Sequence, residues 1–299
     1  MRRKNTFFHF ILITLVLFVA CQSAPVKQVD TQTTITVSIL PQKYFVERIA
    51  GEIVQVNVMV GPGDSPHSYE PKPSQMAALS QSTVYFRIGV EFEDAWMARF
   101  ADINPAMQII DLTQGIEKIP MLGHDQEYAI TNQEEEEHGE LDPHIWTSPT
   151  LVRKMAETIY QTLVEIDAQN EPTYKANLMN FLSDIDTLNA EIIQSLSNIE
   201  NRKLMVFHPA WGYFCEEFGL EQIAVEIGGT EPSAAELANL ILLAKQENIR
   251  ILFAQPEFST QIAEYIAGEI GGEVILISPL AEDWLGNLRL VASQLAELL

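Results

Sequence analysis

The sequence has few positive charges. Its 299 residues include 18 lysines and arginines against 41 aspartates and glutamates, and the formal net charge is −23. Nucleic acids and anionic membrane surfaces are bound largely through lysine and arginine, so this composition argues against both as partners. A cationic ligand is compatible with the acidic balance, and so is solubility alone.

Cysteine and long hydrophobic runs are also scarce. The two cysteines are Cys21 and Cys215, and no internal disulfide can form if Cys21 is modified as described below. Cys215 follows Trp211 and Phe214 in an apolar helical pattern, which favours a buried, inert thiol over a ligand. The main apolar run, Phe7–Ala20, has about 14 residues, whereas a membrane-spanning helix needs roughly 20.

The N-terminus has the three parts of an export signal. Basic residues occupy positions 2–4, the apolar run follows, and Ala20-Cys21 ends it in a sequence that resembles a bacterial lipobox. We expect residues 1–20 to be removed as a lipoprotein signal peptide and Cys21 to become the lipidated first residue. Ordinary secretion is the alternative. The polar residues 21–34 are expected to form a tether to a membrane that faces the periplasm or the cell exterior.

Short apolar runs alternate with short helical patterns in both halves of the chain. This alternation is typical of parallel α/β units, and the length and 47% apolar composition allow two domains. We predict an N-terminal α/β lobe over residues 35–168 and a C-terminal α/β lobe over residues 202–299, each with an open parallel sheet. The predicted strands are Ile35–Leu40, Val54–Val60, Val84–Ile88, Ile109–Leu112, Lys203–Phe207, Gln222–Ile227, Ile249–Ala254 and Val274–Ile277.

A long amphipathic pattern separates the two predicted lobes, over residues 169–201. Apolar residues recur there at three- and four-residue spacing from Tyr174 to Ile199, and Asn170 is the predicted N-cap. A helix of about 29 residues would be roughly 43 Å long. One interpretation is an ordinary core helix. The alternation on both sides favours a rigid helix that joins two lobes, with a ligand site in the cleft between them.

Three of the six histidines, His67, His144 and His208, are predicted to lie just past a strand or in the loop that follows it. Ligands of open α/β sheets bind at the carboxyl ends of the strands, so two facing lobes would bring these side chains together. Three imidazoles from separate loops form a transition-metal site that favours zinc. Each histidine taken alone could instead be a hydrogen-bonded structural residue. Of the other three, His9 is removed with the predicted signal peptide, and His124 and His138 are expected to be solvated rather than ligating.

Short motifs surround these histidines and carry a family resemblance. Gly63–Pro71, Asp142–Trp146 and His208–Phe214 resemble the three histidine motifs of the zinc/manganese-binding proteins of bacterial ABC importers, and Glu231–Leu237 resembles a further segment of that family. The resemblance implies two α/β lobes joined by a long rigid helix, with a metal between them that is delivered to a membrane permease. Histidine at position 208 resembles the zinc-type members, so Zn²⁺ is favoured over Mn²⁺. Asp142 could fix the tautomer of His144 or cap a turn.

The sequence departs from this family at one position. Ser278 stands where the family often has an aspartate that serves as fourth ligand, and a neutral serine is a poor zinc ligand. The fourth ligand is therefore open between water, a nearby acid such as Glu257, and a group from the acidic run Glu134–His138. That run resembles a short form of the charged loop of zinc-type members, and both metal capture and passive disorder remain as interpretations.

The leading hypothesis is a monomeric, lipid-anchored zinc receptor that catalyses nothing and passes its metal to an ABC transporter permease. A zinc-dependent hydrolase is the first alternative, because three histidines and a water also hold catalytic zinc. Against it, the sequence has no His-Glu-x-x-His helix and no obvious general base. A surface adhesin lipoprotein with incidental histidines is the second alternative.

Overall fold

The fold was described from a computed structural model, for residues 32–121, 141–226 and 230–299. The predicted signal peptide, Cys21, His124 and the run Glu134–His138 lie outside these ranges. Residues Gln32–Leu299 form one compact unit. Within the described ranges, no helix combines the length and the apolar character needed to cross a membrane.

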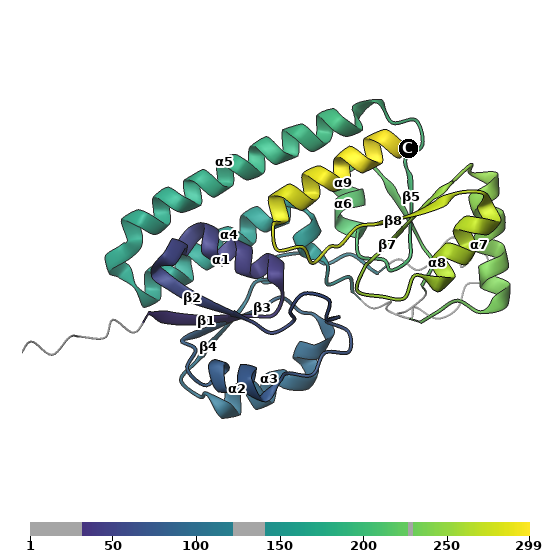
Figure 1. The fold of residues 1–299 in the computed structure, drawn as a ribbon. Helices are drawn as coiled ribbons and strands as arrows, with labels where there is room; N and C mark the ends of the chain where they lie inside the picture. The colour runs from purple at the N-terminus through teal and green to yellow at the C-terminus, as the bar shows by residue number, and fades with distance from the viewer. Residues whose placement is uncertain (1–31, 122–140, 227–229) are drawn as a thin grey trace, which may run out of the picture. The chain divides into compact units, whose positions relative to one another are not determined.

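The N-terminal lobe is built on a four-stranded parallel sheet with the order β2-β1-β3-β4 (Figure 1). Ile35 of the central strand pairs with Val56 on one side and Val84 on the other, and it is fully buried. The strands are β1 Thr33–Val37, β2 Val54–Val58, β3 Val84–Arg87 and β4 Gln108–Asp111, and the helices are α1 Leu40–Ala50, α2 Pro73–Leu79, α3 Glu91–Ile103 and α4 Pro149–Ile166. All four predicted strands are present, but β1 begins two residues earlier than predicted and ends at Val37, and Leu40 is the first residue of α1.

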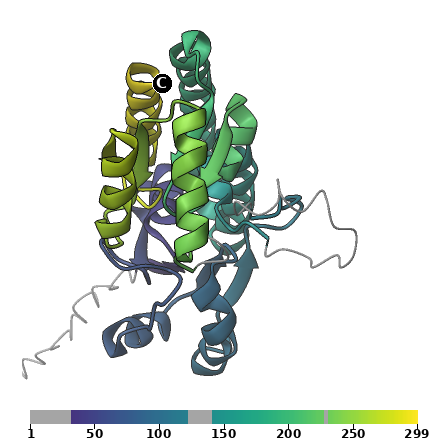
Figure 2. The ribbon, with the colours of Figure 1, turned by 90° about the vertical axis from the view of Figure 1, so that its right-hand side faces the viewer.

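The C-terminal lobe repeats this topology, with the order β6-β5-β7-β8. Met205 of the central strand pairs with Ile223 and Leu252. The strands are β5 Lys203–Val206, β6 Glu221–Ala224, β7 Ile251–Ala254 and β8 Glu273–Leu276, and the helices are α6 Gly212–Phe218, α7 Ala234–Gln246, α8 Gln261–Ile270 and α9 Trp284–Leu298. Figure 2 views this lobe with α7 and α8 in front. The prediction of two parallel α/β lobes is confirmed.

The long helix α5, Glu171–Ser195, joins the two lobes and packs against α1, α4 and α9 (Figure 1). Its 25 residues correspond to a rod of about 38 Å at 1.5 Å per residue. The predicted apolar stripe faces inward, because these side chains are all buried: Tyr174, Leu178, Phe181, Ile185, Leu188 and Ile192. The structure confirms the linking helix but shortens it, since a 3-10 turn, Leu196–Asn198, replaces the last predicted turn.

Asn170 immediately precedes α5, as predicted, but its side chain does not cap the helix. Asn170 has a backbone at φ −94° and ψ 7°, not the extended form of an N-cap, and its amide donates a hydrogen bond to Asp167 at 2.7 Å. Ser74 lies inside α2, because Pro73 is better suited to the first helical position. Ser233 does cap α7, by accepting a hydrogen bond from the backbone of Glu236.

Two tryptophans form hydrogen bonds and ring contacts between the lobes. The Trp146 indole N–H donates to the carbonyl of Pro279 at 2.8 Å, and the Trp284 indole N–H donates to the carbonyl of Trp146 at 2.7 Å. Trp284 also packs edge-on against Phe45 of α1 and Phe181 of α5. Side chains of both lobes therefore belong to one continuous hydrophobic core, which fixes how the histidine-bearing loops face each other.

Candidate metal centre

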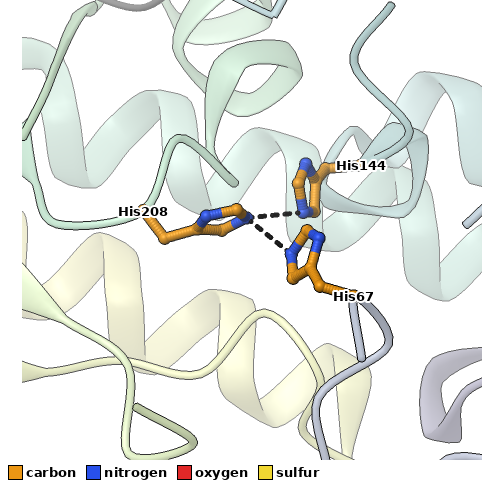
Figure 3. A group of neighbouring side chains, drawn as sticks. All are labelled: His67, His144 and His208. Carbon is orange, nitrogen blue, oxygen red and sulfur yellow. Dashed lines mark hydrogen bonds between the residues drawn. The ribbon is translucent and has the colours of Figure 1, made fainter. Parts of the chain in front are cut away.

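The three predicted histidines meet at one point between the lobes (Figure 3). The Nε2 atom of His208 lies 3.0 Å from that of His67 and 3.4 Å from that of His144. One ring nitrogen from each histidine lies within 4.8 Å of the other two. His67 comes from the loop after β2, and His208 directly follows β5. His144 differs from the prediction, because it precedes the 3-10 turn Ile145–Thr147 rather than following a sheet strand.

Each imidazole is held from behind by a carboxylate. In all three cases the ring Nδ1 lies 2.7 Å from a carboxylate oxygen: His67 with Glu91, His144 with Asp142, and His208 with Glu226. In a neutral ring, an Nδ1–H that donates to the carboxylate leaves Nε2 as a bare acceptor. The three rings therefore direct lone pairs toward their common centre.

This spacing fits a tetrahedral metal ion. Two bare Nε2 acceptors cannot hydrogen-bond to each other, so their approach is favourable only around a cation or a proton. Zinc–nitrogen bonds of 2.0–2.1 Å at tetrahedral angles place two ligand nitrogens about 3.3 Å apart. The observed separations of 3.0 and 3.4 Å bracket that value. Neutral imidazoles with carboxylate partners are the donor set expected for zinc.

The three histidines differ in their exposure to solvent. His144 and His208 are each 3% exposed, whereas the side chain of His67 is 27% exposed. Burial lowers the pKa of His208, against the opposing effect of its bond to Glu226. Burial, the largest single cause, acts to raise the pKa of Glu91, but its hydrogen bonds and the charges of His67 and His144 together lower the net pKa. His67 forms the side of the cluster nearest to solvent.

Two local features hold the loop that carries His67 in position. Gly63 has φ +80°, a left-handed conformation that glycine adopts without steric cost. The backbone N–H of Phe92 donates to the carbonyl of Pro66 at 3.3 Å, which ties the loop to the start of α3. Because Glu91 is the first residue of α3, the same contact aligns His67 with its carboxylate partner.

Gly212 makes room for the carboxylate behind His144. A Cβ atom at Gly212 would lie 2.6 Å from Oδ2 of Asp142, far inside van der Waals contact. The hydroxyl of Tyr213 donates to the carbonyl of Asp142 at 2.9 Å. The start of α6 thus packs directly on the segment that holds His144.

The sequence identified part of this site. All three histidines and Asp142 were predicted, and the pairing of Asp142 with His144 is confirmed. Glu91 and Glu226 were missed. Both follow strands at the edge where the histidines lie, so acids just past β3 and β6 were the available signal.

The remaining candidates lie outside the histidine cluster. Ser278 donates a hydrogen bond from its hydroxyl to Glu257, and neither residue belongs to the group of ring nitrogens that meet within 4.8 Å. The acidic run lies outside the described ranges. Cys215 is buried in α6 and its pKa is raised by burial, as expected for an inert thiol.

Comparisons with known proteins agree on one family. The sequence matches the family described as "Zinc-uptake complex component A periplasmic" over residues 35–298. It is 26% identical over 266 residues to the zinc-binding lipoprotein AdcA of Streptococcus pneumoniae (strain ATCC BAA-255 / R6), covering 88% of this chain and 52% of AdcA. It is 25% identical over 244 residues to the high-affinity zinc uptake system protein ZnuA of Bacillus subtilis (strain 168), covering 80% of this chain and 76% of that protein.

A solved structure gives the same result. A ZnuA deletion mutant with zinc bound is 44% identical in sequence, with a TM-score of 0.81, and the match covers 89% of this chain and 97% of that one. The chain spans about half the length of AdcA, the relative described above. The family match covers nearly all of the described residues, including all three histidines and both lobes. The chain therefore belongs to the zinc-uptake complex component A family.

Proposed function

We propose that this protein is an extracytoplasmic receptor that captures a zinc ion and delivers it to the permease of an ABC importer. His67, His144 and His208 serve as the metal ligands in this proposal. The observation that supports it most directly is the convergence of three Nε2 atoms, each on a ring whose Nδ1 faces a carboxylate. The zinc-bound ZnuA structure supports the choice of metal.

The proposed ligand set favours zinc over manganese. Manganese binds nitrogen donors more weakly than zinc does and depends more on oxygen ligands. We expect zinc to outcompete manganese by about 10³-fold or more, which is roughly 4 kcal/mol.

Competition titration of the metal-free protein with both ions tests the function. Zinc affinity far above manganese affinity is the expected result. Comparable affinities would contradict a zinc receptor, and failure to bind either ion would contradict a metal receptor altogether. Assays of the zinc-loaded protein against ester, peptide and phosphate substrates address the hydrolase alternative, and binding to extracellular matrix proteins addresses the adhesin alternative.

The receptor is proposed to be monomeric and held at a membrane by lipid on Cys21. The N-terminal sequence pattern supports this assignment. Changing Cys21→Ser should release the protein from the membrane fraction into the soluble fraction, as measured by cell fractionation. A serine variant that still partitions with membrane lipid would contradict the anchor without affecting the metal site.

A further inference from the structure

A carboxylate outside the three histidine pairs shares their cavity. The walls of a small cavity between the lobes include His67 and His144 together with Glu257, which lies in the loop between β7 and α8. The Oε2 atom of Glu257 is buried and has no hydrogen-bond partner. A buried, unpartnered carboxylate oxygen is unfavourable unless a cation or a donor meets it.

Ser278 holds the other oxygen of the same carboxylate. The backbone N–H of Leu280 donates to Oγ of Ser278 at 3.1 Å, so the serine hydroxyl hydrogen is available for Oε1 of Glu257. The hydroxyl of Ser278, in the loop that follows β8, thus positions one oxygen of Glu257, whereas the other oxygen has no hydrogen-bond partner. This is the usual arrangement of a ligating carboxylate, whose second oxygen is hydrogen-bonded.

We propose that Glu257 is the fourth ligand of the metal, with Oε2 on the ion and Oε1 held by Ser278. This inference rests on the proposed function. The carboxylate lies outside the group of nitrogens that meet within 4.8 Å, so ligation requires a side-chain rotation that brings Oε2 toward the three Nε2 atoms. Such a rotation replaces an unpartnered oxygen with a bond to the cation, which supplies its driving force.

Among the residues that line this side of the cavity, Glu257 offers the strongest oxygen ligand for a metal ion. Gln255 also lines the cavity, but its amide is neutral and binds zinc more weakly than a carboxylate does. The carboxylates of Glu91, Asp142 and Glu226 already accept from the histidine Nδ1 atoms. Three neutral nitrogens and one charged oxygen make a closed tetrahedral site, in which the side chain of Ser278 orients a ligand instead of binding the metal.

Zinc affinity and the visible absorption of the Co²⁺-loaded protein test this assignment. Cobalt absorption depends on the number and type of ligands, which a merely structural role of Glu257 would not alter. Glu257→Gln should weaken zinc binding about 10²-fold and change the cobalt spectrum, and Ser278→Ala should weaken binding about 10-fold. Glu269→Gln is the matched control, because Glu269 is an exposed acid of α8 in the same lobe.

The outcomes separate this inference from the proposed function. If Glu257→Gln keeps the zinc affinity and the cobalt spectrum of the unmodified protein, while His208→Ala loses binding, the fourth-ligand assignment is overturned and the receptor function stands. If the unmodified protein binds no zinc, the function itself fails. Should Glu257→Gln not fold, an unchanged affinity and spectrum in Ser278→Ala would overturn the assignment equally.

Discussion

The two lobes have the same sheet topology but contribute unequally to the proposed metal site. The N-terminal lobe supplies His67 and His144, and the C-terminal lobe supplies His208. Their cores also differ. Side chains from the N-terminal sheet, α5 and α9 share one hydrophobic core, whereas the outer part of the C-terminal lobe, around α7 and α8, has a separate one. The two lobes therefore repeat the sheet topology but not the organisation of the hydrophobic core.

The largest expected effect comes from removing the ligand of either lobe. His144→Ala and His208→Ala should each weaken zinc binding by about 10³-fold or more, because an intact tetrahedral site needs both lobes. His67→Ala should do the same despite the greater exposure of its side chain. Competition titration against a chelator measures the loss, and unfolding curves of the metal-free variants control for folding. Near-native affinity in His208→Ala would remove the C-terminal lobe from the site.

Substitutions at the junction between the lobes and in the outer core should both lower the free energy of unfolding. Trp284→Ala removes an indole that is 1% exposed and a hydrogen bond between lobes, and should reduce the free energy of unfolding by about 3–5 kcal/mol. Ile266→Ala in α8, also buried, should reduce it by about 2–5 kcal/mol.

The zinc affinities of these two variants should differ more clearly than their free energies of unfolding. Trp284→Ala should also weaken zinc binding, since it loosens the alignment of the lobes, whereas Ile266→Ala should leave the affinity unchanged. Equal zinc affinities in the two variants would mean that the junction does not align the site.

The carboxylates behind the histidines should have intermediate effects. Glu91→Gln, Asp142→Asn and Glu226→Gln each remove the negative charge that orients a ligand ring, and each should weaken zinc binding by about 10–100-fold. Glu269→Gln, at an exposed position on α8, is the control. An affinity unchanged in all three variants would show that the rings are oriented by packing alone.

The smallest effect should be a change of shape on zinc binding. Because α5 is one continuous helix and the tryptophan contacts join the lobes, we expect the backbone angles between the lobes to change little. Solution scattering of metal-free and zinc-loaded protein should give nearly equal radii of gyration. A large decrease on loading would contradict a rigid junction and would make the two lobes independent bodies.

Local patterns predicted most of the fold, and their failures have local causes. The strands were found because their apolar runs are short and bounded by turn residues, and α5 was found because its buried stripe has helical spacing. The start of α5 agrees with the prediction, but the side chain of Asn170 bonds to Asp167 instead of capping the helix. Several amino acids can satisfy such a cap, so composition alone does not decide which contact forms.

The candidate site, like the fold, could be predicted only in part from the sequence. His144 and Asp142 are two residues apart, and their pairing could be predicted from the sequence. His208 and Glu226 are 18 residues apart and follow different strands, so nothing in the local pattern connects them. The sequence by itself determined the two lobes, the linking helix and the three histidines, because these depend on residue type and periodicity. Only the tertiary structure decided which carboxylate stands behind His67 and His208, and how Trp146 and Trp284 join the lobes, because those contacts depend on how distant strands and helices pack.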